Sequence, residues 1–249
     1  PALMREGVTL VVSPLIALMR DQVRALREAG IAAGALTSAD DQEEREAVLE
    51  DLRAGQLKLL YMAPERLGSA GAASFLRRAG VGLIAVDEAH CVSQWGHDFR
   101  PDYLRLGALR QALDGVQMVA LTATADEETR AEIIARLFEG TAPATFLRGF
   151  DRPNLHLAFR PKAEPRRQLL DFVNTRRGRS GIVYCASRAK TESLARALGE
   201  AGHTALAYHA GLEAKARRAA EWRFQAEDGL VVCATIAFGM GIDKPDIRY

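Results

Sequence analysis

The chain is 249 residues long, enough for one large domain or two of ordinary size, and we expect two. Apolar residues make up 48% and charged residues 26%, the composition of a soluble globular protein. Lys and Arg (33) nearly balance Asp and Glu (32), so the net charge gives no case for nucleic-acid binding and any basic surface must be local.

The three cysteines, Cys91, Cys185 and Cys233, are scattered through the chain. Because their spacing is not that of bridges or paired ligands, the sequence indicates neither a disulfide framework nor a zinc site, and a reducing cytosol fits best. No apolar run approaches the length of a membrane span, and the first residues do not form a signal peptide. We therefore expect no membrane partner and no zinc site in this chain.

The first 149 residues alternate short apolar runs with amphipathic segments. The runs are typical of buried strands and the segments of helices, and a helix after each strand implies parallel pairing. Gly30 ends the first helix, and Asp40 is predicted to cap the second. Strands are predicted at residues 10–12, 32–36, 58–62, 81–86, 117–121 and 144–147, and helices at residues 15–29, 40–53, 63–67, 72–79, 102–113 and 126–137.

Residues 149–154 have the composition of a domain connection, and Pro161 and Pro165 follow soon after. The alternation then starts again, with strands predicted at 181–184, 205–208 and 230–233 and helices at 166–175, 190–201 and 213–226. The sequence therefore predicts an α/β fold of two tandem domains with mainly parallel sheets. The first domain is predicted at residues 1–149 and the second at residues 150–249.

Two adjacent carboxylates, Asp87 and Glu88, follow the predicted strand at 81–86. Open α/β sheets bind their ligands at the carboxyl ends of strands, and acids there suit a Mg²⁺–nucleotide site. Asp87 is predicted to hold the metal and Glu88 to polarise the attacking water. The alternative is that both acids cap a following helix, because acids favour helix starts.

A short loop after the acid pair is rich in aromatic side chains and cations. Trp95 and Phe99 can stack on bases, and Arg100 can stack or pair with phosphate. The alternative is a small hydrophobic cluster beneath a loop, and it applies most to Phe99 and Tyr103, whose spacing also suits packing. His97 can hydrogen-bond to either base or phosphate.

Several motifs of this chain resemble those of the RecQ family of DNA helicases, and together they span nearly the whole chain. The most specific segment is DEAHCVSQWGHDFRPDY, which begins at Asp87. DEAH alone is shared with RNA helicases, but the aromatic-rich extension is similar to the one that couples DNA binding to ATP hydrolysis in this family. The other motifs are VVSPLIALMRDQV from Val11, YMAPERL from Tyr61, LTATA from Leu121, IVYCASRAKTESLA from Ile182, YHAGL from Tyr208 and VVCATIAFGMGIDKPDIRY from Val231.

This resemblance implies two RecA-like domains with ATP bound between them, both truncated at the ends of this chain. It implies ATP and Mg²⁺ as cofactors and single-stranded and forked DNA as partners. The implied activity is ATP-dependent 3′ to 5′ translocation that unwinds duplexes in DNA repair and recombination. The implied location is the bacterial cytoplasm, at the nucleoid, or the nucleus of a eukaryote.

The resemblance also implies roles for individual residues. Asp87 matches the Mg²⁺-binding acid, Glu88 the general base, and His90 a relay between the nucleotide and the DNA. Nucleotide contacts are implied for Asp87, Glu88, Thr122, Gly241 and Asp243, and DNA contacts or coupling for Ser13, Arg66, Trp95, His97, Phe99, Arg100, Thr124, Ser187, Arg188 and Thr235.

Some of these motif residues also have structural alternatives. The alternatives are an N-cap for Thr124 or Asp126, an ion pair of Glu65 with Arg66, a satisfied strand-end histidine for His209, and a plain tight turn for Gly239 and Gly241.

No GxxxxGK[ST] phosphate loop occurs in these residues, and position 1 is not Met. The resemblance implies that this loop lies before Pro1 and an arginine motif after Tyr249, so we expect both ends to be cut and this chain alone not to turn over ATP. Two alternative functions remain, a non-catalytic module that clamps or anneals DNA and an RNA helicase of the DEAH type. The segment after His90 speaks against the second.

Overall fold

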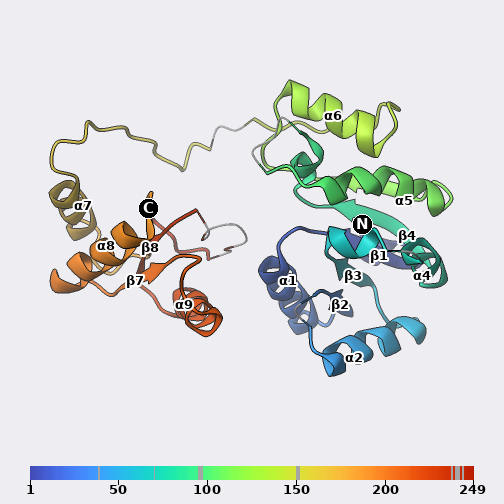
Figure 1. Ribbon diagram of the computed structural model, residues 1–249, viewed down its shortest axis with the longest axis horizontal. Helices are drawn as coiled ribbons and strands as arrows, with labels where there is room; N and C mark the ends of the chain where they lie inside the picture. Colours follow the sequence, from blue (N-terminus) through green and yellow to red (C-terminus); the bar gives the residue numbers. More distant parts are fainter. Residues whose placement is uncertain are drawn as a thin grey trace. The chain divides into compact units, whose positions relative to one another are not determined.

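The computed structural model in Figure 1 describes residues 1–38, 40–69, 71–94, 98–149, 152–236, 238, 242 and 244–249, with the backbone alone for Ala17. The chain divides into two compact units, Pro1–Arg148 and Gly149–Tyr249. Each unit has its own parallel sheet and its own buried core. No helix of the described residues is long and apolar enough to cross a membrane.

The first unit is built on a five-stranded parallel sheet in the order β2-β3-β1-β4-β5. Val12 of β1 lies beside Val86 of β4, and Val86 lies beside Ala120 of β5. The carboxyl ends of these three strands therefore meet at one edge of the sheet. The strands are β1 (Val8–Val12), β2 (Ala33–Leu36), β3 (Leu59–Met62), β4 (Val81–Val86) and β5 (Gln117–Ala120).

Helices cover both faces of this sheet, as expected for parallel strands that are apolar on both sides. Met19 and Val23 of α1 pack on one face, and α2, α4, α5 and α6 pack on the other against side chains such as Leu10 and Ile84. The helices are α1 (Ile16–Glu28), α2 (Gln42–Arg53), α3 (Pro64–Leu67), α4 (Ala72–Arg78), α5 (Leu106–Ala112) and α6 (Glu127–Leu137), with 3₁₀ turns η1 (Ala2–Met4), η2 (Ala89–Val92) and η3 (Pro101–Arg105).

Two details of the first unit differ from the sequence prediction. The cap of α2 is Asp41, which forms a reciprocal capping box with Glu44, and not Asp40. Asp40 instead accepts hydrogen bonds from the amide and hydroxyl of Thr37 in the loop before the helix. The strand predicted at 144–147 is wrong, because this segment pairs with no strand of the described residues and leaves Phe146 exposed.

The second unit contains a three-stranded parallel sheet in the order β6-β8-β7. Phe224 of α9 packs on one face, and Val173 of α7 and Leu198 of α8 pack on the other. The predicted α/β class with parallel sheets is therefore confirmed. The elements are β6 (Gly181–Tyr184), β7 (Ala205–Tyr208), β8 (Val231–Ala234), α7 (Pro165–Asn174), α8 (Arg188–Glu200) and α9 (Ala214–Ala226).

Replacing Gly107 by alanine is expected to destabilise the first unit by roughly 1–3 kcal/mol, the usual cost of overpacking. A Cβ at this position of α5 would collide with the backbone carbonyl of Arg136 in α6. The contact is between backbones, so neither helix can relieve it by rotating a side chain. The free energy of unfolding from urea titration measures the effect.

Gly199 of α8 provides the matched control for this change, because a Cβ there meets no atom within 4 Å. Gly199→Ala should stabilise the second unit by about 0.5–1 kcal/mol, since alanine favours the helix and restricts the unfolded chain. If the two variants shift stability in the same direction, close packing of α5 on α6 is not what requires glycine at position 107.

Candidate active site

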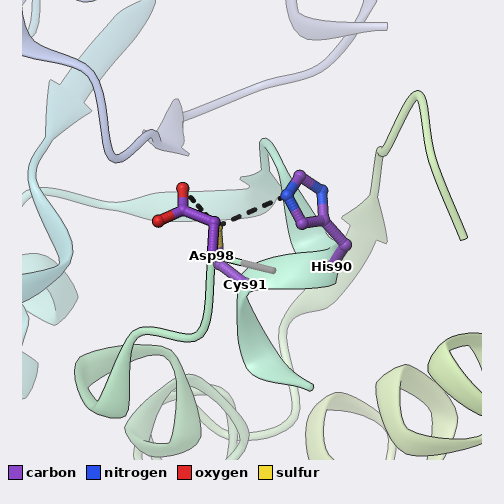
Figure 2. Close-up of side chains that lie close together, drawn as sticks. All are labelled: His90, Cys91 and Asp98. Carbon is purple, nitrogen blue, oxygen red and sulfur yellow. Dashed lines mark hydrogen bonds between the residues drawn. The ribbon is translucent and has the colours of Figure 1, made fainter. Parts of the chain in front are cut away.

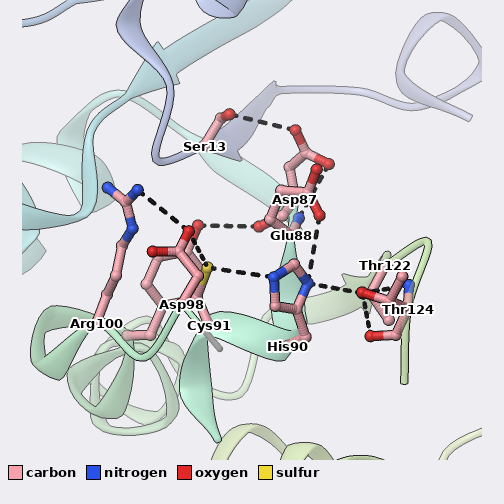
Figure 3. Close-up of polar contacts among 10 residues, drawn as sticks. Ser13, Asp87, Glu88, His90, Cys91, Asp98, Arg100, Thr122 and Thr124 are labelled. Carbon is pink, nitrogen blue, oxygen red and sulfur yellow. Dashed lines mark hydrogen bonds and ion pairs between the residues drawn. The ribbon is translucent and has the colours of Figure 1, made fainter. Parts of the chain in front are cut away.

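The polar residues of the candidate site follow directly on three neighbouring strands of the first unit. Ser13 comes directly after β1, and Asp87 and Glu88 come directly after β4. One residue, Leu121, separates Thr122 from the end of β5. Since these strands are parallel and in register, their carboxyl ends place the side chains together, as Figure 3 shows. The order of elements predicted from the sequence therefore positions this group.

Asp87 is held from three directions. Its Oδ2 accepts a hydrogen bond from Ser13 Oγ at 3.2 Å, and its Oδ1 accepts one from the Glu88 amide at 3.0 Å. Its backbone carbonyl accepts one from the hydroxyl of Tyr103 at 2.9 Å. Tyr103 is fully buried, and this burial raises its pKa, so the phenol remains a donor. The packing alternative thus describes Tyr103, which is part of the core and holds the backbone of Asp87 through this hydrogen bond.

A carboxylate beside a hydroxyl at a strand end fits Mg²⁺, which takes oxygen ligands and is usually held by one or two carboxylates and substrate phosphates. Asp87 is the residue that would hold it, with Ser13 adjacent. Both donors are hard oxygens; Ser13 is fully buried, whereas Asp87 is only half-buried, so the carboxylate is the donor that phosphate and water can reach.

Glu88 adopts a left-handed backbone conformation with φ of 47°. This region is uncommon for residues other than glycine, and such strain often marks functional positions. Its carboxylate lies 3.3 Å from Nδ1 of His90, so it points to the histidine instead of capping the short turn η2. The helix-cap alternative therefore does not describe Glu88.

His90 connects the acid pair to the end of β5. The ring is buried, and its Nδ1 also lies 3.0 Å from Oγ1 of Thr122. The Thr122 hydroxyl donates to the carbonyl of Thr124, so its oxygen accepts from the histidine. Because Glu88 and Thr122 are acceptors toward Nδ1, the proton of the neutral ring lies on Nδ1, and Nε2 then carries the lone pair.

Among the described residues, Thr124 contributes to this arrangement through its backbone, since its amide donates to Thr122 Oγ1 and its carbonyl accepts from the same hydroxyl. The capping alternative describes Asp126, whose carboxylate accepts from the amide of Thr129 and caps α6. Hydrogen bonds from Thr129 lower the pKa of Asp126. The threonine motif therefore combines a contact to His90 with a helix start.

Arg100 ties the loop after His90 back to the sheet. Its Nη2 lies 3.2 Å from Oδ2 of Asp98, and its Nη1 donates to the carbonyl of Pro14 at 3.2 Å. The backbone amide of Arg100 donates to the carbonyl of Cys91 at 2.9 Å. The guanidinium predicted to contact DNA thus bridges two protein segments in this structure, one of them the turn after β1.

Three other residues of the predicted site fall on or near this loop. Trp95 and His97 lie outside the described residues, and Phe99 is half-buried. The loop begins at Gln94, and the backbone amide of Gln94 donates to the carboxylate of Glu132 on α6 at 3.0 Å. Sequence reasoning missed Glu132, because an acid on the charged face of a helix carries no signal of a distant partner.

The guanidinium of Arg66 donates to the carbonyl of Thr37 at 3.3 Å. Its partner is therefore the loop before α2, and the alternative of an ion pair with Glu65 does not describe it. In the second unit, Ser187 caps α8 by accepting from the amide of Lys190, and Arg188 is exposed in its first turn. Thr235 follows β8, and its amide donates to the carbonyl of Tyr208.

The carboxyl edge of the second sheet thus collects three of its motifs, those of Ser187, His209 and Thr235. His209 is buried, and its Nε2 lies 3.1 Å from a carboxylate oxygen of Glu192, so the satisfied-histidine alternative describes that nitrogen. Gly239, Gly241 and Asp243 lie outside the described residues.

Comparison with known families matches residues 2–133 to "DEAD/DEAH box helicase" and residues 164–249 to "Helicase conserved C-terminal domain". The chain is 46% identical to "ATP-dependent DNA helicase RecQ" of Pasteurella multocida over its full length, which is 39% of that protein. It is 42% identical to "ATP-dependent DNA helicase RecQ" of Bacillus subtilis, covering 42% of that protein. The chain belongs to the RecQ branch of the DEAD/DEAH box helicases. It spans about two fifths of the length of these relatives.

Solved helicase structures share the fold. The helicase Lhr of Mycobacterium smegmatis, bound to single-stranded DNA and AMP-PNP, superposes with a TM-score of 0.63 at 22% identity, covering 97% of this chain and 35% of that one. The DUF1998 helicase MrfA, bound to DNA and AMPPNP, gives a TM-score of 0.71 at 16% identity, covering 97% and 37%. The two units are therefore tandem RecA-like helicase domains with parallel sheets.

Proposed function

We propose that this RecQ-branch chain forms the motor of an ATP-dependent DNA helicase that moves 3′ to 5′ on single-stranded DNA and unwinds forked duplexes in repair and recombination. The observation that carries the proposal is one continuous set of polar contacts in the first unit. It runs from Ser13 and Asp87 through Glu88 and His90 to Thr122. Through Glu88 and His90, these contacts join the acid pair, which is proposed to face the nucleotide, to the start of the loop at 91–103, called the aromatic loop below.

On the nucleotide side, Asp87 would hold Mg²⁺, and Glu88 would orient the attacking water as general base. When bound there, Mg²⁺ would neutralise charge on the phosphates. His90, which carries its proton on Nδ1 toward Glu88 and Thr122, keeps the carboxylate in place and senses its charge. Gly241 and Asp243 are proposed to contact the nucleotide from the second unit.

On the DNA side, the aromatic loop offers stacking surfaces and Arg100 connects the loop to the turn at Pro14. Movement of the loop on DNA would pull on this turn and on the segment that begins at His90. The residues proposed to contact DNA or to relay its binding are Ser13, Arg66, Trp95, His97, Phe99, Arg100, Thr124, Ser187, Arg188 and Thr235. Such a protein would work at the chromosome, in the bacterial cytoplasm or a eukaryotic nucleus.

The test compares ATP hydrolysis by the whole protein without nucleic acid, with single-stranded DNA and with RNA of the same sequence. We expect strong stimulation by DNA and weak stimulation by RNA, because the 2′-OH distinguishes the two at a site. Duplexes with a 3′ tail should unwind and those with a 5′ tail should not. Equal stimulation by RNA would favour an RNA helicase, and absence of hydrolysis would favour a DNA-clamping module.

A further inference from the structure

Three side chains of different chemistry converge behind the acid pair, although two of them are seven residues apart in the sequence. In Figure 2, dashed lines join the thiol of Cys91 to the ring of His90 and to the carboxylate of Asp98. The Cys91 sulfur lies 3.9 Å from His90 Nε2 and 3.7 Å from Asp98 Oδ2, and the three ligand atoms all lie within 4.8 Å of one another.

This donor set is one that zinc prefers, with one nitrogen, one sulfur and one oxygen. Ligand atoms around a tetrahedral zinc ion lie roughly 3.5 Å apart, given bonds of about 2.0–2.3 Å. The two distances from the Cys91 sulfur exceed that value by only a few tenths of an ångström. The His90 and Asp98 ligand atoms also lie within 4.8 Å of each other, so side-chain rotations would bring all three atoms to coordination distance. Three protein ligands leave the fourth position to water.

The surroundings of His90 prepare it as a ligand. Its Nδ1 proton faces Glu88 and Thr122, so the lone pair of Nε2 is directed toward the Cys91 sulfur. Metal-binding histidines commonly donate their other ring N–H to a carboxylate in this way. The thiol is fully buried, whereas the Asp98 side chain is 32% exposed, which gives a cation a route in from solvent.

The charges around the cluster also favour a cation. Asp98 and Glu88 face it with two carboxylates, against one guanidinium, that of Arg100, on Asp98 Oδ2. Burial and the charge of Asp98 raise the pKa of the Cys91 thiol to about 12, so without a metal the thiol stays protonated and donates to Asp98. A cation at the centre reverses this preference, because a coordinated thiol is deprotonated.

We propose that His90, Cys91 and Asp98 form a binding site for a thiophilic divalent cation of the Zn²⁺ class, and that its occupancy inhibits DNA-stimulated hydrolysis. Binding forms a sulfur–metal bond and releases the thiol proton to solvent. The bound cation would fix the ring of His90, and the Nδ1 proton of His90 would then hold the carboxylate of Glu88. The cation would also draw the carboxylate of Asp98 away from Arg100. The inhibitory part rests on the function proposed above, whereas the binding does not.

Binding is tested on this chain with Co²⁺, a spectroscopic substitute for Zn²⁺, in a buffer free of thiols. We expect an ultraviolet thiolate-to-metal charge-transfer band with tetrahedral visible bands, and displacement of Co²⁺ by Zn²⁺ but not by Mg²⁺. Cys91→Ser should abolish the band, and Asp98→Asn should weaken affinity at least about tenfold, the size of loss seen even for residues behind the ligands.

Cys185→Ser is the matched control, because Cys185 is also buried but its thiol faces the carbonyl of Val183. It should leave the band unchanged. A band that survives Cys91→Ser, or no band in the unchanged chain, would overturn the site. If Cys91→Ser fails to fold, Asp98→Asn decides alone, since that side chain is partly exposed; unchanged Co²⁺ affinity in this variant would also overturn the site.

Inhibition is tested separately on the whole protein as the ratio of DNA-stimulated rates without and with Zn²⁺. We expect the ratio to be large in the unchanged protein and at least about tenfold smaller in Asp98→Asn. A Co²⁺ band together with equal ratios in both proteins would overturn the inhibitory role. No DNA-stimulated hydrolysis at all would instead count against the proposed function, while the Co²⁺ titration would still decide the site.

Discussion

Replacing Glu88 by glutamine is expected to reduce DNA-stimulated ATP hydrolysis of the whole protein by roughly 10²–10⁴-fold, the usual contribution of a general base. Glutamine keeps the size of the side chain and a hydrogen bond to His90, but it cannot accept a proton from water. Phosphate release at saturating ATP and single-stranded DNA measures the effect. Because Asp87 and the loop are untouched, DNA binding in the presence of nucleotide should persist.

Glu128→Gln is the matched control, since Glu128 is an exposed acid in the first turn of α6. It should leave hydrolysis unchanged. If Glu88→Gln keeps full DNA-stimulated turnover, Glu88 is not the general base, and its unusual backbone conformation needs another explanation. Loss of both hydrolysis and DNA binding in Glu88→Gln would indicate a folding defect, which a thermal unfolding curve detects.

Replacing Arg100 by alanine is expected to uncouple hydrolysis from DNA. The guanidinium bridges Asp98 and the carbonyl of Pro14, so its removal separates the aromatic loop from the turn after β1. We expect the factor by which single-stranded DNA stimulates hydrolysis to fall roughly tenfold or more, the size of typical couplings between sites. The measurement is the ratio of rates with and without DNA.

Two further variants separate bridging from charge. Arg100→Lys keeps the charge but cannot bond in two directions in one plane, so it should be defective as well. Arg105→Ala removes an exposed cation that pairs with Asp102 in the same segment, and it should keep the stimulation. The sequence makes Trp95→Ala a companion test. If stimulation survives both Trp95→Ala and Arg100→Ala, the loop is structural.

Much of the fold was predictable from hydrophobic patterns. Most strands and helices lie within one or two residues of their predicted positions, because buried parallel strands are short apolar runs and turns between them contain glycine or proline. The errors have local causes. The run at 144–147 has strand composition, but it pairs with no strand in the part of the chain that the structure describes. The cap of α2 lies one residue after the predicted one, because Asp40 and Asp41 are both good caps.

The site was predictable only in part. The sequence located Asp87 and Glu88 at the end of β4, and parallel order explains why Ser13 and Thr122 join them. It did not predict that Tyr103 would reach back to the carbonyl of Asp87. That contact depends on how the loop returns to the sheet, which no periodic pattern encodes.

By itself the sequence determined the α/β class, the RecQ-type motifs and the acid pair, since these depend on residue order and composition along single elements. The tertiary structure alone decided that Arg100 bridges to Pro14 and that His90, Cys91 and Asp98 meet. The cysteine spacing indicated no zinc site, because zinc motifs are recognised in sequence by paired Cys or His ligands, and this cluster holds a single cysteine, Cys91. A 3₁₀ turn and a returning loop brought these three donors together instead.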